Sequence, residues 1–267
     1  MSAKETSPIL ARALKERLAK GDLTLGPVMM YDFWPGYIEM FKEIGYHFVF
    51  VDCEHAAATT REVEELCRVA RLIDLPVLLR VETAMYHRIR RCIDMGPAGL
   101  IVPWVETMEQ VETLREGAYL PPKGRRGPGG PGNSWAANFF RDGWDAVERD
   151  LCNVVQFETP QGIERAGELA APDWVHAGMI GPYDLSVNMG RAGRMDHPEV
   201  VAAIDIALAG CRQVGKTCAM VVGTPDEAKF WVDRGFHFIV TGEISYWARS
   251  HGTWFKEQLA RLAEHNE

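Results

Sequence analysis

Polar and ionisable residues follow four of the apolar runs in this sequence, where each run ends. Asp52, Glu54 and His55 lie at the end of the run 47–52, and Arg80 lies at the end of the run 76–80. Gln156 and Glu158 lie at the end of the run 153–158, and Gly181 and Asp184 lie at the end of the run 175–181. Carboxylates without histidine or cysteine at ligand spacing form a hard oxygen site, which suits Mg²⁺ or Mn²⁺. Arginine can bind a substrate oxyanion through two parallel hydrogen bonds, and histidine can move protons near neutral pH. The residue types therefore predict metal-assisted chemistry.

The two candidate metal-binding acids also have structural interpretations. An aspartate directly after a strand is often a helix cap, and for Asp184 taken alone both interpretations stay open. Gln156 and Glu158 are two residues apart, so they point to the same face of a strand. If that face is the interior of the fold, a carboxylate there is unfavourable unless it is paired or binds a metal. Glu158 is therefore the stronger candidate of the two.

The other candidates have structural roles that compete with chemistry. A lone histidine such as His55 is more often a structural hydrogen-bonding group than a catalyst, and Arg80 could simply pair with Asp52 or Glu54. Asp94 is predicted at the end of a helix, where a negative charge opposes the helix dipole. A residue placed against its local preference suggests a partner, and we consider His55 or a neighbouring backbone amide for that role.

These residues need elements that bring the ends of several strands to one place. Short apolar, β-branched runs recur at Leu25–Met30, His47–Asp52, Pro76–Arg80, Gly99–Pro103, Asn153–Glu158, Val175–Gly181, Thr217–Val222 and His237–Thr241. Nearly continuous apolar strands that alternate with helical segments indicate a parallel sheet covered on both faces. Eight such units favour an α/β fold of the (β/α)₈ (TIM) barrel type over residues 1–267 as one domain. Chemistry in that fold takes place at the C-terminal ends of the strands, here called the mouth.

Local signals define the remaining elements. The residues after Met30 do not match the G-x-G-x-x-G that a dinucleotide-binding sheet needs. Ser7 is a predicted N-cap, with Pro8 at the first helical position and Gly21 as the stop of an N-terminal helix. The glycine-rich segment Gly124–Asn133 follows the fourth strand, and both a mobile surface loop and an active-site lid stay open for it.

Composition excludes several classes of protein. The chain has 267 residues, 29 lysines and arginines against 37 aspartates and glutamates, and a formal net charge of −8. This charge gives no attraction to nucleic acid or to an anionic membrane. No apolar run approaches the roughly 18 residues of a membrane-spanning helix, and the first residues lack the apolar stretch of a signal peptide. The six cysteines form no C-x-x-C pair, so we expect reduced thiols in a cytoplasmic protein.

Several segments together resemble the HpcH/HpaI aldolase family of metal-dependent class II pyruvate aldolases. They are VDCEHA at 51–56, LLRV at 78–81, IDMGPAGLIVPWV at 93–105, PPKGRRG at 121–127, VVQFETPQGIERA at 154–166 and IGPYDLSVNMG at 180–190. The resemblance runs in register from about residue 22 to residue 240. It implies a (β/α)₈ barrel that assembles into a homohexamer, as a trimer of dimers that exchange their C-terminal helices.

The resemblance also implies a role for each candidate residue. Glu158 and Asp184 would bind the metal, Mg²⁺ or Mn²⁺ with Co²⁺ as a further option. His55 would transfer protons, with Asp94 raising its basicity and Asp52 sharing its role. Arg80 would stabilise an enolate. The residues that would contact the 2-oxo acid are Gln156, Gly181, Asp184 and the backbone of Tyr183. Arg126, in the glycine-rich segment, matches a family position near the mouth.

The implied reaction is the reversible cleavage of a 4-hydroxy-2-oxo acid to pyruvate and an aldehyde through a pyruvate enolate. A Schiff-base aldolase is disfavoured, because it needs a lysine inside the mouth and no lysine ends a predicted strand. Decarboxylation of oxaloacetate, or cleavage of a citramalyl- or malyl-type acid, would use the same enolate and stays open. A non-catalytic barrel scaffold is disfavoured, since it gains nothing from desolvating charged side chains.

Departures from the commonest family pattern leave the aldehyde open. Cys53 stands where many members have glycine, and Tyr183 replaces a small residue beside Asp184. Trp104 and the run Trp135–Phe140 add aromatic bulk at the predicted mouth. These residues hint at a bulky or apolar aldehyde, although packing or subunit contacts would account for them equally.

Overall fold

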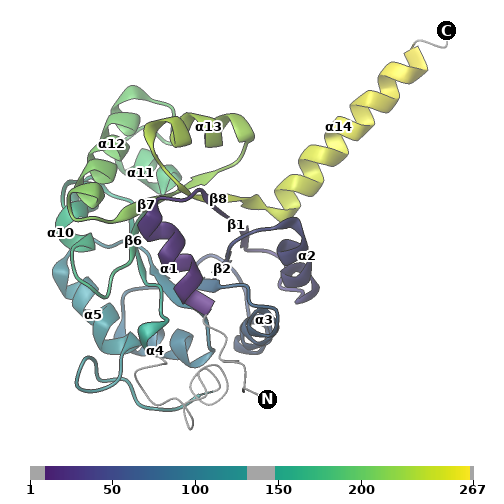
Figure 1. Cartoon of the computed structure of the whole chain (residues 1–267). Helices are drawn as coiled ribbons and strands as arrows, with labels where there is room; N and C mark the ends of the chain where they lie inside the picture. Colours follow the sequence, from purple (N-terminus) through teal and green to yellow (C-terminus); the bar gives the residue numbers. More distant parts are fainter. Residues whose placement is uncertain (1–9, 131–147, 265–267) are drawn as a thin grey trace.

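The computed structural model, which describes residues 10–130 and 148–264, is a closed barrel of parallel strands with helices around it (Figure 1). The strands are β1 (Thr24–Met29), β2 (Val49–Asp52), β3 (Val77–Arg80), β4 (Gly99–Val102), β5 (Val154–Phe157), β6 (Ala177–Ile180), β7 (Thr217–Val222) and β8 (Phe238–Glu243). Each strand pairs with the next, and β8 closes the barrel on β1. The predicted (β/α)₈ barrel is confirmed, and every predicted strand lies within two residues of an observed one at each end.

The helices alternate with the strands. They are α1 (Leu10–Lys20), α2 (Gly36–Ile44), α3 (Thr60–Leu72), α4 (Tyr86–Asp94), α5 (Met108–Ala118), α9 (Pro160–Glu164), α10 (Ala166–Ala170), α11 (Pro182–Asn188), α12 (Pro198–Gln213), α13 (Pro225–Arg234) and α14 (Ile244–Glu264). Local residues set the helix ends. Thr224 Oγ accepts a hydrogen bond from the Glu227 amide at the start of α13, and Gly235 ends that helix in the left-handed conformation, with φ of 99°.

Alternate residues of each strand point into the barrel and away from it. The inward residues Phe50, Leu78, Val154, Met179 and Ala219 belong to one buried apolar cluster inside the barrel. Because the side-chain period of a strand is two, the next inward positions at the mouth are polar in β2, β3 and β5. They are Asp52, Arg80 and Gln156, all buried. The same alternation that builds the core therefore also aims the polar residues of the site.

Helix α1 closes the opposite end of the barrel. Ala11, Leu14 and Leu18 are buried in the same cluster as Phe48 and Cys152, which lie just before β2 and β5. Gly21 follows the helix with φ of 72°, as the predicted stop requires. The predicted cap Ser7 and Pro8 lie outside the described residues. Apolar packing thus fills the N-terminal end of the barrel and leaves the polar end as the mouth.

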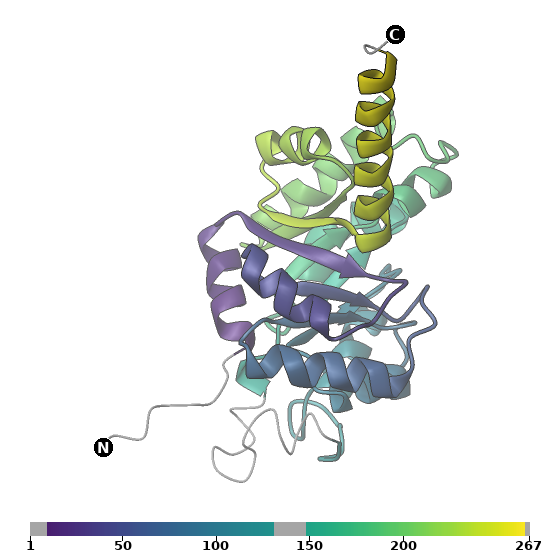
Figure 2. The same ribbon diagram turned by 90° about the vertical axis from the view of Figure 1, so that its right-hand side faces the viewer.

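Helix α14 projects away from the barrel in both views (Figures 1 and 2). Near its start, the Trp247 ring stacks on Tyr46 with 6.2 Å between ring centroids. Farther along, Trp254, Phe255 and Leu259 are 52%, 55% and 53% exposed. An exposed row of large apolar side chains is consistent with the predicted exchange of this helix between subunits, which stays a prediction. Within residues 10–130 and 148–264, no helix is both long and apolar enough to cross a membrane.

Candidate functional site

Asp52 and Arg80 form a buried ion pair at the mouth. They are the last residues of the neighbouring strands β2 and β3 and stand opposite each other in the register. Arg80 Nε donates to Asp52 Oδ1 at 2.9 Å, and Arg80 Nη2 donates to Asp52 Oδ2 at 2.7 Å. Burial lowers the pKa of Arg80, but the hydrogen bonds and charge of Asp52 outweigh burial, so that this pKa is raised. The pair fixes a permanently charged guanidinium inside the mouth.

Glu54 links this ion pair to His55. Its Oε2 lies 3.2 Å from Arg80 Nε and 3.8 Å from His55 Nε2. Its backbone amide donates to Asp52 Oδ1 at 2.9 Å. Burial raises the pKa of Glu54, while the charge of Arg80 opposes that rise. The side chain of His55 is about half exposed, so the imidazole stands where solvent and substrate can reach it.

Glu158 is the most deeply buried carboxylate of the site except Asp52. It follows β5, has 1% of its surface exposed, and accepts hydrogen bonds from Trp104 N at 2.9 Å and Gln156 Nε2 at 2.8 Å. Burial raises its pKa to about 7, the charges of Glu54 and Asp184 add to the rise, and the Trp104 amide opposes it. Burial thus makes ionisation of this carboxylate less favourable than in water, and a bound cation would favour the ionised form.

Two backbone features position the Glu158 carboxylate. Trp104 has a left-handed backbone with φ of 53°, which is unusual for a residue with a side chain, and its amide donates to Glu158. Gly181 lies against the other oxygen, because a Cβ at this position would be 2.4 Å from Glu158 Oε1. Only glycine leaves room there for the carboxylate. The sequence predicted Gly181 as a site residue but gave the Trp104 amide no role.

Asp184 reaches the same mouth from the first turn of α11. Its charge raises the pKa of both Glu54 and Glu158, which places the three carboxylates within electrostatic reach of one another. Asn188 Nδ2 donates to the backbone carbonyls of Glu158, at 3.0 Å, and Asp184, at 2.9 Å, and so ties α11 to the end of β5. The side chain of Tyr183 is 59% exposed and adds an aromatic surface beside Asp184.

The residues of the mouth fit a divalent cation. Glu54 Oε2 and Gln156 Oε1 are buried acceptor atoms that receive no hydrogen bond from the described protein, although Glu54 Oε2 is paired with the charge of Arg80. In the described part of the chain, no three histidine, cysteine, aspartate or glutamate side chains are grouped closely enough to bind one metal ion. Glu158 and Asp184 stay the predicted metal ligands, and with two protein oxygens Mg²⁺ would take its other ligands from water and substrate.

Asp94 and Arg126 lie at the other end of the barrel in this chain. Asp94 is the last residue of α4 and precedes β4 by five residues, on the side away from the mouth. Burial raises the pKa of Asp94, and the charges of Arg90 and Arg126 oppose that rise. Arg126 is itself almost fully buried. Gly130 packs on the Asp94 side chain. The structure thus brings neither Asp94 to His55 nor Arg126 to the mouth of its own barrel.

The glycine-rich segment also lies away from the mouth, as far as it is described. Gly124 approaches the carbonyls of Tyr119 and Arg115 near the end of α5, and the segment then runs to Asp94. Residues 131–133 of this segment and the run Trp135–Phe140 lie outside the described residues. Residues 124–130 therefore lie along α4, with Arg125 against Tyr86 at its first residue and Gly130 against Asp94 at its last.

Comparisons with known proteins place this chain in a family. Residues 33–245 match the model of the HpcH/HpaI aldolase/citrate lyase family. The chain is 35% identical over 226 residues to a hydroxypyruvate/pyruvate aldolase of Delftia acidovorans, which covers 80% of this chain and 81% of that protein. It is 30% identical over 238 residues to the 2-keto-3-deoxy-L-rhamnonate aldolase of Escherichia coli K12, with 88% of each chain covered.

A solved structure gives the same result for the fold. The crystal structure of an HpcH/HpaI aldolase from Desulfitobacterium hafniense DCB-2 matches with a TM-score of 0.85 and 24% sequence identity, over 92% of this chain and 96% of that one. The family model, the relatives and this barrel agree over most of the length of the chain. The chain therefore belongs to the HpcH/HpaI aldolase/citrate lyase family of carbon–carbon lyases.

Proposed function

We propose that the chain catalyses the reversible aldol cleavage of 4-hydroxy-2-oxo acids to pyruvate and an aldehyde, with a divalent metal ion bound by Glu158 and Asp184. The observation that carries this proposal is the buried Glu158 carboxylate, whose pKa of about 7 reflects burial beside two further acids. Such a group is suited to bind a cation. The names of the relatives, a hydroxypyruvate/pyruvate aldolase and a 2-keto-3-deoxy-L-rhamnonate aldolase, support a 2-oxo acid as substrate.

Arg80 is the residue we assign to the enolate oxygen. A bound Mg²⁺ or Mn²⁺ would polarise the ketone of the 2-oxo acid and acidify the neighbouring carbon. The hydrogen bonds of Arg80 to Asp52 use Nε and Nη2, so Nη1 is the nitrogen that we assign to the substrate oxygen. Asp52 is fully buried and bound to Arg80 through both oxygens. This geometry favours a positioning role for Asp52 over proton transfer.

His55 is the residue we assign to proton transfer. In cleavage, His55 takes the proton of the 4-hydroxyl group and the bond between C3 and C4 breaks. The electron pair of that bond forms the enolate, and the aldehyde is released. A proton then returns to C3 and gives the methyl group of pyruvate. Glu54 Oε2, at 3.8 Å, would stabilise the imidazolium between these steps. We assign Gln156 and the backbone of Gly181 and Tyr183 to contacts with the 2-oxo acid.

Exchange of the methyl protons of pyruvate tests this proposal without any aldehyde. In D₂O with the diamagnetic ion Mg²⁺, we expect loss of the pyruvate methyl signal by NMR, and addition of EDTA should stop the exchange. Glu158→Gln should slow it by about 100-fold or more, since one preorganised charged group is removed from the enolate site. Glu168→Gln is the matched control, because Glu168 lies in α10, is exposed and pairs with Arg165. Undiminished exchange in EDTA would overturn the proposal.

A further inference from the structure

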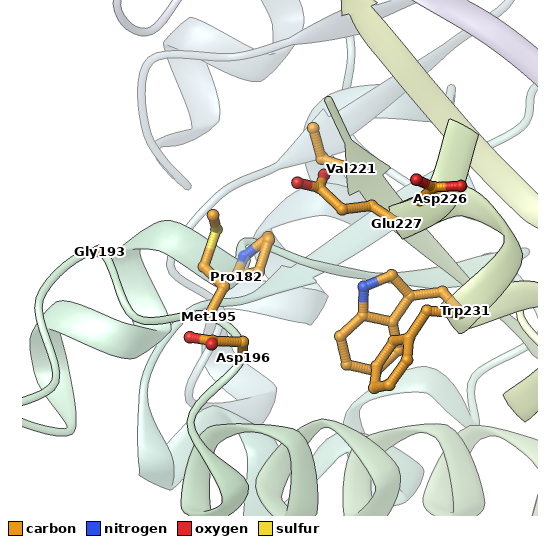
Figure 3. Close-up of a pocket in the computed structure, with 9 residues that line it drawn as sticks. Pro182, Gly193, Met195, Asp196, Val221, Asp226, Glu227 and Trp231 are labelled. Atoms are coloured by element: carbon orange, nitrogen blue, oxygen red, sulfur yellow. The ribbon is translucent and has the colours of Figure 1, made fainter. Parts of the chain in front are cut away.

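A cavity of about 530 Å³ opens beside the mouth, between α11 and α13 (Figure 3). Its walls include Pro182, Met195, Val221, Glu227, Phe230 and Trp231. They come from the start of α11, the segment after it, β7 and the first turns of α13. In Figure 3 the indole of Trp231 faces Pro182 and Met195 across the cavity, and the Glu227 side chain extends toward Val221.

The inner end of this cavity is level with the Glu158 carboxylate. Strands β6 and β7 are paired with Ile180 opposite Met220, so Gly181 and Val221 are the next residues along and lie side by side. Val221 packs against the apolar cluster inside the barrel, and Gly181 lies against Glu158 Oε1. A molecule that reacts at the mouth therefore has this cavity directly beside it, on the β7 side.

The walls combine aromatic and acidic groups. Phe230 and Trp231 meet edge to face with 4.9 Å between ring centroids, and Trp231 is almost fully buried. Glu227 Oε2 accepts a hydrogen bond from Gly223 N at 2.7 Å, which fixes its carboxylate at the cavity. Asp196 and Asp226 add two more acids to the lining. Among the described residues of the lining there is no lysine or arginine.

We propose that this cavity holds the chain of the aldehyde, that it takes an uncharged hydroxyaldehyde, and that it disfavours an aldehyde with its own carboxylate. The inference rests on the proposed function, which requires an electrophile next to the 2-oxo acid. Carboxylate oxygens accept hydrogen bonds from hydroxyl groups, and aromatic faces contact the C–H groups of the same chain. A carboxylate on the aldehyde would meet three acids without a positive charge in the described lining to offset them.

The ratio of kcat/KM for two aldehydes tests the inference. We would measure the addition of pyruvate to D-glyceraldehyde and to succinic semialdehyde, and we expect the wild-type enzyme to favour glyceraldehyde. Glu227→Gln keeps an oxygen for the Gly223 amide and removes the charge, so the ratio should shift toward the semialdehyde by about fivefold, the effect of one nearby charge in water. Phe230→Leu should lower kcat/KM for glyceraldehyde, since one aromatic wall is lost.

Asp233→Asn is the matched control for Glu227→Gln. Asp233 lies on the same helix, pairs with Lys229 at 2.6 Å and does not line the cavity, so the same change of charge should leave the ratio as it is. A preference of the wild-type enzyme for the semialdehyde, or an unchanged ratio in Glu227→Gln, would overturn the inference. Exchange of pyruvate methyl protons by the wild-type enzyme reports the proposed function separately, because no aldehyde is present in that measurement.

Discussion

At the scale of single residues, Glu158 is held in an environment that opposes its charge. It accepts hydrogen bonds from Trp104 and Gln156, yet burial dominates and raises its pKa from 4.5 to about 7. The proton is therefore bound more tightly in the folded chain than in the unfolded chain. By linkage, ionisation of Glu158 without a cation destabilises the folded protein by up to roughly 3 kcal/mol.

This environment predicts a specific dependence of stability on pH. The raised pKa stabilises the metal-free protein at low pH, and we expect that contribution to be lost as the pH rises from about 4.5 to about 7. A cation binds the ionised carboxylate, so Mn²⁺ should raise the melting temperature more at pH 8 than at pH 5.5. Thermal unfolding at both pH values, with Mn²⁺ or with EDTA, measures the difference.

Glu158→Gln is the control for the pH prediction. The amide has no carboxyl proton to lose, so the contribution of this group to the pH dependence should disappear and the effect of Mn²⁺ should shrink. If Mn²⁺ stabilises the wild type equally at pH 5.5 and pH 8, Glu158 does not titrate in this range when the metal binds.

At the scale of the elements, the end of β6 determines where the Glu158 carboxylate lies. Gly181→Ala would introduce a Cβ 2.4 Å from Glu158 Oε1, and the carboxylate would have to move. We expect the exchange of pyruvate methyl protons to fall by about 100-fold, the effect of a displacement of roughly 1 Å in a catalytic group. Gly127→Ala is the control, because a Cβ at that position has nothing within 4 Å. Equal exchange rates in the two variants would show that Glu158 tolerates the displacement.

The strands and most of the mouth could be predicted from the sequence because each strand is a continuous apolar run with polar residues at its end. A parallel barrel gathers all such ends at one place, so Asp52, Arg80 and Glu158 met as predicted. The role of the Trp104 amide could not be predicted, since tryptophan has no preference for a left-handed backbone. Residue type likewise did not show that Glu54 lies between Arg80 and His55.

The position of Asp94 shows another limit of prediction from the sequence. A helix that follows a barrel strand returns the chain to the N-terminal end, so the last residue of α4 lies far along the barrel from the end of β2. The segments around Asp94 and Arg126 resemble those of the family. Such a resemblance does not show which loops of one chain meet in space. Their predicted roles toward His55 and the mouth therefore stay predictions.

At the scale of the whole molecule, α14 predicts an oligomer. Phe255 and Leu259 are four residues apart, so they lie on one side of the helix, and both are more than half exposed. We expect these residues to be covered by a second subunit in solution, in agreement with the predicted exchange of C-terminal helices. Size-exclusion chromatography with light scattering should give a mass of several chains for the wild type and a smaller mass for the double variant Phe255→Ser, Leu259→Ser.

Glu257→Ser is the control for this variant, because it changes a polar residue on the same turn of α14. Its mass should equal that of the wild type. A wild-type protein with the mass of one chain would contradict the predicted exchange, whereas the barrel and its mouth would be unaffected.

Helix α1 closes the N-terminal end of the barrel, and this closure affects the order in which the products leave. Because Ala11, Leu14 and Leu18 fill that end, both reactants have to pass the same entrance in the described part of the molecule. Under the proposed reaction, the 2-oxo acid sits at the inner position and the aldehyde nearer to solvent. The aldehyde then departs first and pyruvate last, so abundant pyruvate would keep the enzyme loaded and ready for synthesis.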